Sequence, residues 1–174
     1  QHNTGASNTF VGSAAGHNNT IAGNNVFIGR EAGYNNLDQN DNTFIGSGSG
    51  YHNTAPNNTF VGSNAGHNII SGAENVIIGR DAGFNNQSGN GNVFLGYKAG
   101  YDETGSNKLY LSNSDTSTPL IYGEFDNGIA TINDVLRLAP RSSYPSDPEE
   151  GMIFYHAALN VLFCWDGSNW RALW

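Results

Sequence analysis

The chain has 174 residues, a formal net charge of −8 and only seven Lys and Arg residues, which are scattered along the sequence. No basic patch could follow a phosphate backbone, so we do not expect nucleic acid as a partner. Charged residues make up 13% of the chain and Gly numbers 23, which is typical of short strands joined by tight turns. No run approaches the roughly 20 apolar residues of a membrane span, so we expect no membrane insertion.

Six copies of one sequence repeat fill the chain up to about residue 106. In each copy, Asn is followed by Thr or Val and then by an apolar pair whose first residue is usually Phe. Gly comes next, followed by a variable pair, a second pair that is mostly Ala-Gly, and an aromatic residue or His. A short strand, a Gly corner and a polar return loop predict one coil of a parallel β-solenoid. A seventh, degenerate copy is expected to begin at Asn107. The six copies begin at Asn8, Asn25, Asn42, Asn58, Asn75 and Asn92, in steps of 17, 17, 16, 17 and 17 residues.

Each predicted strand carries two apolar positions that point to opposite faces. One column consists of Phe10, Phe27, Phe44, Phe60, Ile77 and Phe94, and the other of Val11, Ile28, Ile45, Val61, Ile78 and Leu95. A coil of about 17 residues has one interior, which can cover only one column. The other would leave a long apolar stripe in water, so we expect other copies of the chain to cover it. Three thin coils enclose an axial core better than two, which favours a homotrimer and leaves open which column faces the axis.

The repeat offers little for catalysis. Glu31 and Asp81 occupy equivalent positions, but three coils place them about 14 Å apart, which fits neither carboxylate spacing of glycoside hydrolases. His17 and His67 share a repeat position with aromatic residues and predict a stacked column rather than an ion site on a symmetry axis. We therefore expect no enzyme, no catalytic residues, no cofactor and no metal.

The rest of the chain divides into three parts after the 1–106 shaft. Residues 107–139 read as a β-rich transition, and residues 140–151 as a Pro-containing linker. Residues 152–174 read as a three-stranded β-meander that forms the C-terminal tip. The tip holds all three Trp residues of the chain. Its candidate ligand-binding residues are Tyr155, Trp165, Asp166, Asn169, Trp170 and Trp174, since exposed rings stack on sugars or protein receptors, although the same rings could instead form the tip's own core.

The repeats, with motifs such as NTFVGSAAGHNN, resemble the left-handed β-roll heads of YadA-type trimeric autotransporter adhesins. The segment SNKLYLSNSDTSTPLIYGEFDNGIATIN resembles a continuation found in bacterial surface and phage tail-fibre proteins. The ending EEGMIFYHAALNVLFCWDGSNWRAL is similar to short trimeric tail-fibre tip modules. These resemblances imply a trimeric fibre end from a phage tail, a contractile injection particle or a bacterial adhesin.

The function expected from these features is attachment. A homotrimeric, extracellular shaft would join an upstream fibre or particle component to a tip that binds a cell-surface receptor or glycan. One alternative is a purely structural, trimerising fibre segment without a binding site. Another is a polysaccharide depolymerase with a site between subunits. A flat ice-binding face is a third, although Val26, Val76 and Val93 interrupt its Thr column.

Overall fold

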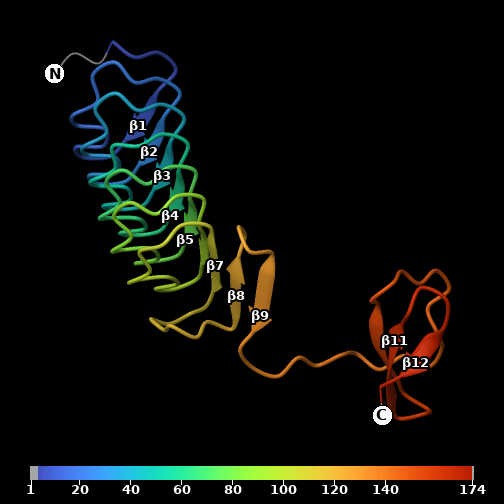
Figure 1. Cartoon of the computed structure of the whole chain (residues 1–174). Helices are drawn as coiled ribbons and strands as arrows, with labels where there is room; N and C mark the ends of the chain where they lie inside the picture. Colours follow the sequence, from blue (N-terminus) through green and yellow to red (C-terminus); the bar gives the residue numbers. More distant parts are fainter. Residues whose placement is uncertain (1–3, 174) are drawn as a thin grey trace. The chain divides into compact units, whose positions relative to one another are not determined.

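The computed structural model describes residues 4–173 and contains only β-strands and turns in that range. No helix there could cross a membrane. The chain forms two compact units, Gln1–Asp134 and Val135–Trp174 (Figure 1). The predicted fold class is confirmed in outline, since a parallel β-solenoid with a spacing of about 17 residues precedes a three-stranded antiparallel sheet.

The solenoid contributes one strand per coil. Strands β1–β7 pair in parallel in chain order, with Phe10 opposite Phe27 and each later coil in the same register. Two antiparallel strands complete this nine-stranded sheet. Its strands are β1 (Thr9–Val11), β2 (Val26–Ile28), β3 (Thr43–Ile45), β4 (Thr59–Val61), β5 (Val76–Ile78), β6 (Val93–Leu95), β7 (Lys108–Leu111), β8 (Ile121–Glu124) and β9 (Ile129–Ile132).

Two glycine positions per coil make the corners. Gly29 has a φ of +134°, and a Cβ there would lie 2.5 Å from the carbonyl oxygen of Gly46 in the next coil. Gly33 has a φ of +60°, and its Cβ would lie 2.6 Å from the ring of Phe27. Both positions therefore require Gly, because the backbone is left-handed and the adjacent space is filled. The regular spacing of Gly in the sequence reflects these two constraints.

The Phe column faces the solenoid interior. Phe27, Phe44 and Phe60 have no exposed surface, and successive rings from Phe10 to Phe60 stack with centroids 4.8–5.0 Å apart. Small buried residues such as Ala32 and Ala65 fill the rest of the narrow core. The Val and Ile column points outward, with Val11 55% and Ile78 41% exposed. The column covered by the chain's own coil is thus the aromatic one.

A column of buried Asn residues joins the coils. The Oδ1 of each Asn accepts a hydrogen bond from the backbone N–H of its counterpart in the next coil, as Asn58 does from Asn75 at 2.9 Å. Most of the Nδ2 groups donate to a carbonyl in the return loop, as Asn75 does to Gly89. The Asn column is therefore mainly a side-chain-to-backbone network. Each side chain pairs backbone groups that the polar return loop would otherwise leave unsatisfied.

The seventh coil begins one residue later than the sequence comparison predicts. Lys108, rather than Asn107, donates its backbone N–H to the Oδ1 of Asn92 and so occupies the Asn position. Tyr110 then lies opposite Phe94 and takes the interior position. The error arose because an Asn at 107 imitates the start of a repeat, whereas the sixth coil is one residue shorter than most.

The second unit contains an antiparallel sheet of β10 (Ile153–His156), β11 (Val161–Trp165) and β12 (Trp170–Ala172). The segment that the sequence marks as a linker contributes to this unit. The Arg141 backbone forms a bridge with β10, donating to the Tyr155 carbonyl and accepting from Ala157. The Tyr144 ring contacts the rings of Phe154, His156, Phe163 and Trp170.

Candidate interaction surfaces

The outer face of the nine-stranded sheet carries no charge. Strand alternation and the pairing register place two outward positions on every strand. All of them are apolar, Thr or Gly, and the apolar run extends beyond the repeats onto β8 and β9. They are Thr9, Val26, Thr43, Thr59, Val76, Val93, Leu109, Gly123 and Ala130 in one column and Val11, Ile28, Ile45, Val61, Ile78, Leu95, Leu111, Ile121 and Ile132 in the other.

This outer face is open in the single chain. Ile28 and Ile45 are each 36% exposed, and Leu111 is 37% exposed. A cleft of about 620 Å³ continues the face beside Leu95, Leu111 and Leu120, and its other lining residues are mostly Ser, Thr and Asn. An exposed, contiguous and uncharged face of this kind is typical of an interaction surface.

A second column of rings runs along the return side of the coils. Neighbouring rings have centroids 4.8–5.2 Å apart and planes within 9° of parallel. Because the ring faces cover one another, only their edges are available to a ligand over most of the column. The predicted aromatic or His column is therefore present as continuous stacking, and it comprises His17, Tyr34, Tyr51, His67, Phe84 and Tyr101.

His52 lies next to this ring column and interrupts an amide column on the surface. Asn18 donates to Asn35, and the Asn35 side chain bonds to the Nδ1 of His52. His52 also meets His67 edge to face at 5.5 Å. Burial lowers the pKa of His52, and the neighbouring His67 lowers it further. In residues 4–173, no group of three or more His, Cys, Asp or Glu side chains is arranged to hold a metal ion.

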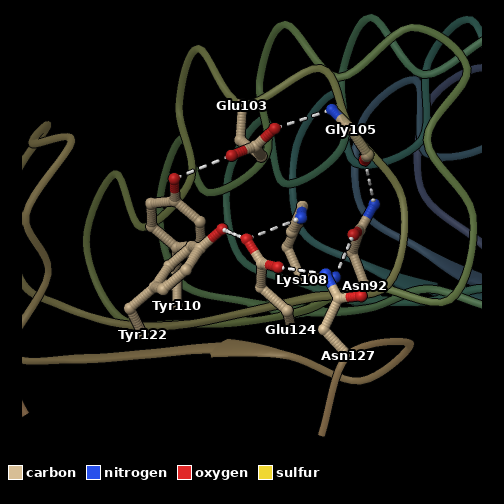
Figure 2. Close-up of polar contacts among 8 residues, drawn as sticks. All are labelled: Asn92, Glu103, Gly105, Lys108, Tyr110, Tyr122, Glu124 and Asn127. Atoms are coloured by element: carbon tan, nitrogen blue, oxygen red, sulfur yellow. Dashed lines mark hydrogen bonds and ion pairs between the residues drawn. The ribbon is translucent and has the colours of Figure 1, made fainter. Parts of the chain in front are cut away.

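A polar network closes the C-terminal end of the solenoid (Figure 2). Glu103 accepts the Tyr110 hydroxyl and the Gly105 N–H, both at 2.7 Å. The Gly105 carbonyl in turn accepts the Nδ2 of Asn92, the last Asn of the buried column. Burial and this carboxylate raise the pKa of Tyr110. The network thus joins the last full coil to the strand that follows it.

Glu124 forms the other half of the network. It accepts the Tyr122 hydroxyl at 2.6 Å, lies 3.2 Å from the Lys108 Nζ and accepts the side chain of Asn127 (Figure 2). These bonds lower its pKa to about 2, with Tyr122 the largest cause. Tyr110 and Tyr122 meet edge to face at 5.4 Å and continue the Phe column. We call this arrangement the cap. Sequence reasoning missed the cap, and the one signal available in the sequence was Tyr110, an aromatic residue in line with the Phe column.

The tip residues predicted to bind a ligand fall on both faces of the small sheet. Trp165 and Trp170 pair across β11 and β12, with ring centroids 5.3 Å apart, and both are half-buried. Tyr155 lies on the opposite face, where it lines an apolar groove of about 490 Å³. The groove's other lining residues are Leu136, Leu138, Pro140, Ile153 and Leu162. One ligand on a single face cannot contact all of the predicted residues, and Trp174 lies outside the described ones.

The turn beside the Trp pair is organised by Asp166. One oxygen of its carboxylate accepts hydrogen bonds from the backbone N–H groups of Ser168 and Asn169. The other oxygen accepts a hydrogen bond from the Nε of Arg171 at 2.6 Å. Arg171 and these N–H groups lower the pKa of Asp166 to about 2. Asp166 therefore shapes the turn, whereas the exposed Asn169 side chain is available for an outside contact.

The carboxylates considered for catalysis have other partners. Glu31 pairs with Arg30 at 2.7 Å, and Asp81 pairs with Arg80 at 3.3 Å. Comparison of the chain with known protein families, with curated proteins and with solved structures finds no match.

Proposed function

We propose that the chain is a trimeric, extracellular fibre or adhesin segment that mediates attachment to a cell surface or glycan. The observation that carries this proposal is the uncharged outer face of the β1–β9 sheet. In the proposed assembly this face turns toward the symmetry axis and is covered by the same face of two other copies. The Phe column is then the core of each chain, and the Val and Ile column is the core of the trimer.

The energetics of the outer face favour such an assembly. Fully burying a Val or Ile side chain is worth about 1.5–3 kcal/mol, and the outward Ile28, Ile45 and Ile78 side chains keep 36–41% of their surface exposed. Covering the remainder would contribute on the order of 0.5–1 kcal/mol for each of them. No charged side chain on the two columns has to be desolvated in return, which would otherwise cost several kcal/mol.

The tip is proposed to supply the receptor contact through Trp165, Trp170 and Asn169. Paired Trp rings next to an exposed polar turn suit a sugar face or a receptor side chain. The groove beside Tyr155 on the other face is then available for contacts between copies. In the proposed molecule, the solenoid spaces this tip from an upstream fibre or particle component.

The test of assembly is the subunit count of the full chain, measured by light scattering for the wild type and two variants. Ile45→Asp puts a charge on the outer face, and we expect it to reduce the trimer to monomers. Leu37→Asp is the matched control, because Leu37 is 48% exposed in a return loop away from this face; it should remain trimeric. A folded wild-type monomer at micromolar concentration contradicts the proposal.

The test of attachment is binding of the full chain to a glycan array and to host-cell surfaces. We expect saturable binding that Trp165→Ala weakens by about 2 kcal/mol or more while the trimer persists. A trimer that binds nothing would support the purely structural alternative. Loss of polymer viscosity on incubation would support the depolymerase.

A further inference from the structure

The sequence contains two Asn-Gly pairs, Asn90–Gly91 and Asn127–Gly128. An Asn followed by Gly is chemically vulnerable, because no Cβ hinders the next backbone nitrogen as it approaches the side-chain carbonyl carbon. Asn is also among the thermolabile residues that heat-adapted proteins avoid. Whether a pair reacts depends on how firmly the fold holds the two groups apart. The two pairs differ in how firmly hydrogen bonds hold them.

Asn90–Gly91 is held between neighbouring coils. The Gly91 N–H donates to the Ala73 carbonyl at 3.1 Å, and the Asn90 Oδ1 accepts the Ala73 N–H at 2.9 Å. The Asn90 N–H donates to Ser106 at 2.9 Å. The attacking nitrogen and the side chain are thus both engaged by Ala73 of the coil before them. Reaction here would require the coils to separate locally.

Asn127–Gly128 lies in the exposed turn between β8 and β9. Gly128 has a φ of +63°, and no atom lies within 4 Å of the place a Cβ would take. Its N–H has no hydrogen-bond partner among the described residues. Within residues 4–173, one hydrogen bond restrains the Asn127 side chain, from its Nδ2 to Glu124 (Figure 2). The pair therefore has the freedom that Asn90–Gly91 lacks.

We propose that Asn127 is a site of spontaneous deamidation that alters the cap. The Gly128 nitrogen bonds to the Asn127 Cγ, its proton is lost to solvent, and the Cγ–Nδ2 bond breaks to release ammonia. Water then opens the resulting five-membered imide at either carbonyl. The net reaction consumes one water, releases one ammonia and leaves aspartate or isoaspartate at 127.

The product changes the sign of one contact in the cap. The amide donor to Glu124 is replaced by a carboxylate, so an attractive hydrogen bond becomes a repulsion between like charges. Glu124 also holds Lys108 and Tyr122, so the repulsion acts on the network that closes the solenoid. The new carboxylate competes with Glu124 for the Lys108 ammonium. Deamidation would thus loosen the cap as the protein ages.

The first test follows both Asn residues in the folded full chain at mildly alkaline pH. Peptide mapping by mass spectrometry, with an isoaspartate-specific methyltransferase, measures conversion at each site. We expect Asn127 to convert severalfold faster than Asn90 in the folded chain, and the two to convert at similar rates in denaturant. Equal rates in the folded chain overturn the proposal, as does an Asn127 that converts only in denaturant.

The second test measures the effect on the cap with Asn127→Asp. Gln87→Glu is the matched control, since it also turns an exposed side-chain amide into a carboxylate in the same unit, away from the cap and from the cleft beside Leu111. We expect Asn127→Asp to raise the pKa of Glu124, followed by carboxyl NMR, and to lower the melting temperature more than the control does. If both variants behave alike, deamidation at 127 has no effect on the cap, and that part of the proposal is wrong.

Discussion

Phe44 and Ile45 are adjacent in β3, yet Phe44 has no exposed surface and Ile45 keeps 36% of its surface exposed. Strand alternation sends one side chain into the solenoid and the other to the outer sheet face. The same division holds in the neighbouring coils. Substitution of Phe44 therefore tests the fold of one chain, and substitution of Ile45 tests the proposed association of several chains.

Phe44→Ala should lower the free energy of unfolding by about 3–5 kcal/mol, because it removes a ring stacked between two others and leaves a cavity. Urea denaturation followed by circular dichroism measures this. Phe125→Ala is the control, since Phe125 is 54% exposed in a turn, and its effect should stay within about 0.5 kcal/mol. Equal losses in the two variants would contradict the assignment of the Phe column to the core.

Gly33→Ala and Gly128→Ala separate backbone strain from crowding. Both glycines have nearly the same φ, +60° and +63°, but only a Cβ at Gly33 would collide, at 2.6 Å from the Phe27 ring. Gly128→Ala should cost about 1–2 kcal/mol for the left-handed backbone alone. Gly33→Ala should cost a further 1–3 kcal/mol, roughly, from overpacking. Thermal unfolding of both variants measures which one loses more stability. A smaller loss of stability for Gly33→Ala would show that the Phe27 ring moves aside.

The solenoid could be predicted because each coil repeats the same physical demands. Gly at two corners, Asn at the strand start and Phe at the inward position recur, so one coil's pattern supports the next. The sequence could not decide whether Phe44 or Ile45 faces inward, because both are large and apolar. The choice depends on the Gly33 and Gly50 corners, which leave just enough room beside the Phe27 and Phe44 rings.

The cap and the tip were less predictable because their contacts occur once. Glu103 contacts Tyr110, and Glu124 contacts Lys108, because of turns that are not part of the repeat pattern. Tyr144 lies in a Pro-containing stretch that reads as a linker, and its packing against Phe154 depends on the bridge at Arg141. Local composition carries no information about such a pairing.

Stability should fall as the pH drops below the usual pKa of His. The folded chain lowers the pKa of His52, chiefly by burial, so the unfolded chain binds a proton more readily. Stability is therefore lost from about pH 6.5 downward until the folded pKa is passed. His52→Asn introduces the residue that stands at the equivalent repeat positions, Asn18 and Asn35, and it should reduce this loss of stability. Melting temperatures between pH 7.5 and about pH 5 measure it, and unchanged pH dependence in His52→Asn would assign the effect elsewhere.

The two Trp residues of the described tip should differ in what they contribute. Trp170 packs against Phe154 at 4.7 Å and lies near Tyr144, whereas Trp170 is the one ring that Trp165 contacts among the described residues. Trp170→Ala should therefore destabilise the tip. Trp165→Ala should leave it folded and weaken receptor or glycan binding by about 2 kcal/mol or more.

Fluorescence quenching and binding assays on the full chain separate the two roles. With Trp170 and Trp174 each replaced by Phe, the remaining Trp165 should be quenched by acrylamide and protected when the ligand binds. Phe at 170 keeps an aromatic contact with Phe154, so the tip should remain folded. Binding that survives Trp165→Ala while the tip stays folded would place the recognition site elsewhere, because no other half-exposed ring of the described tip adjoins the exposed Asp166–Asn169 turn. The Trp pair would then serve only to hold β11 and β12 together.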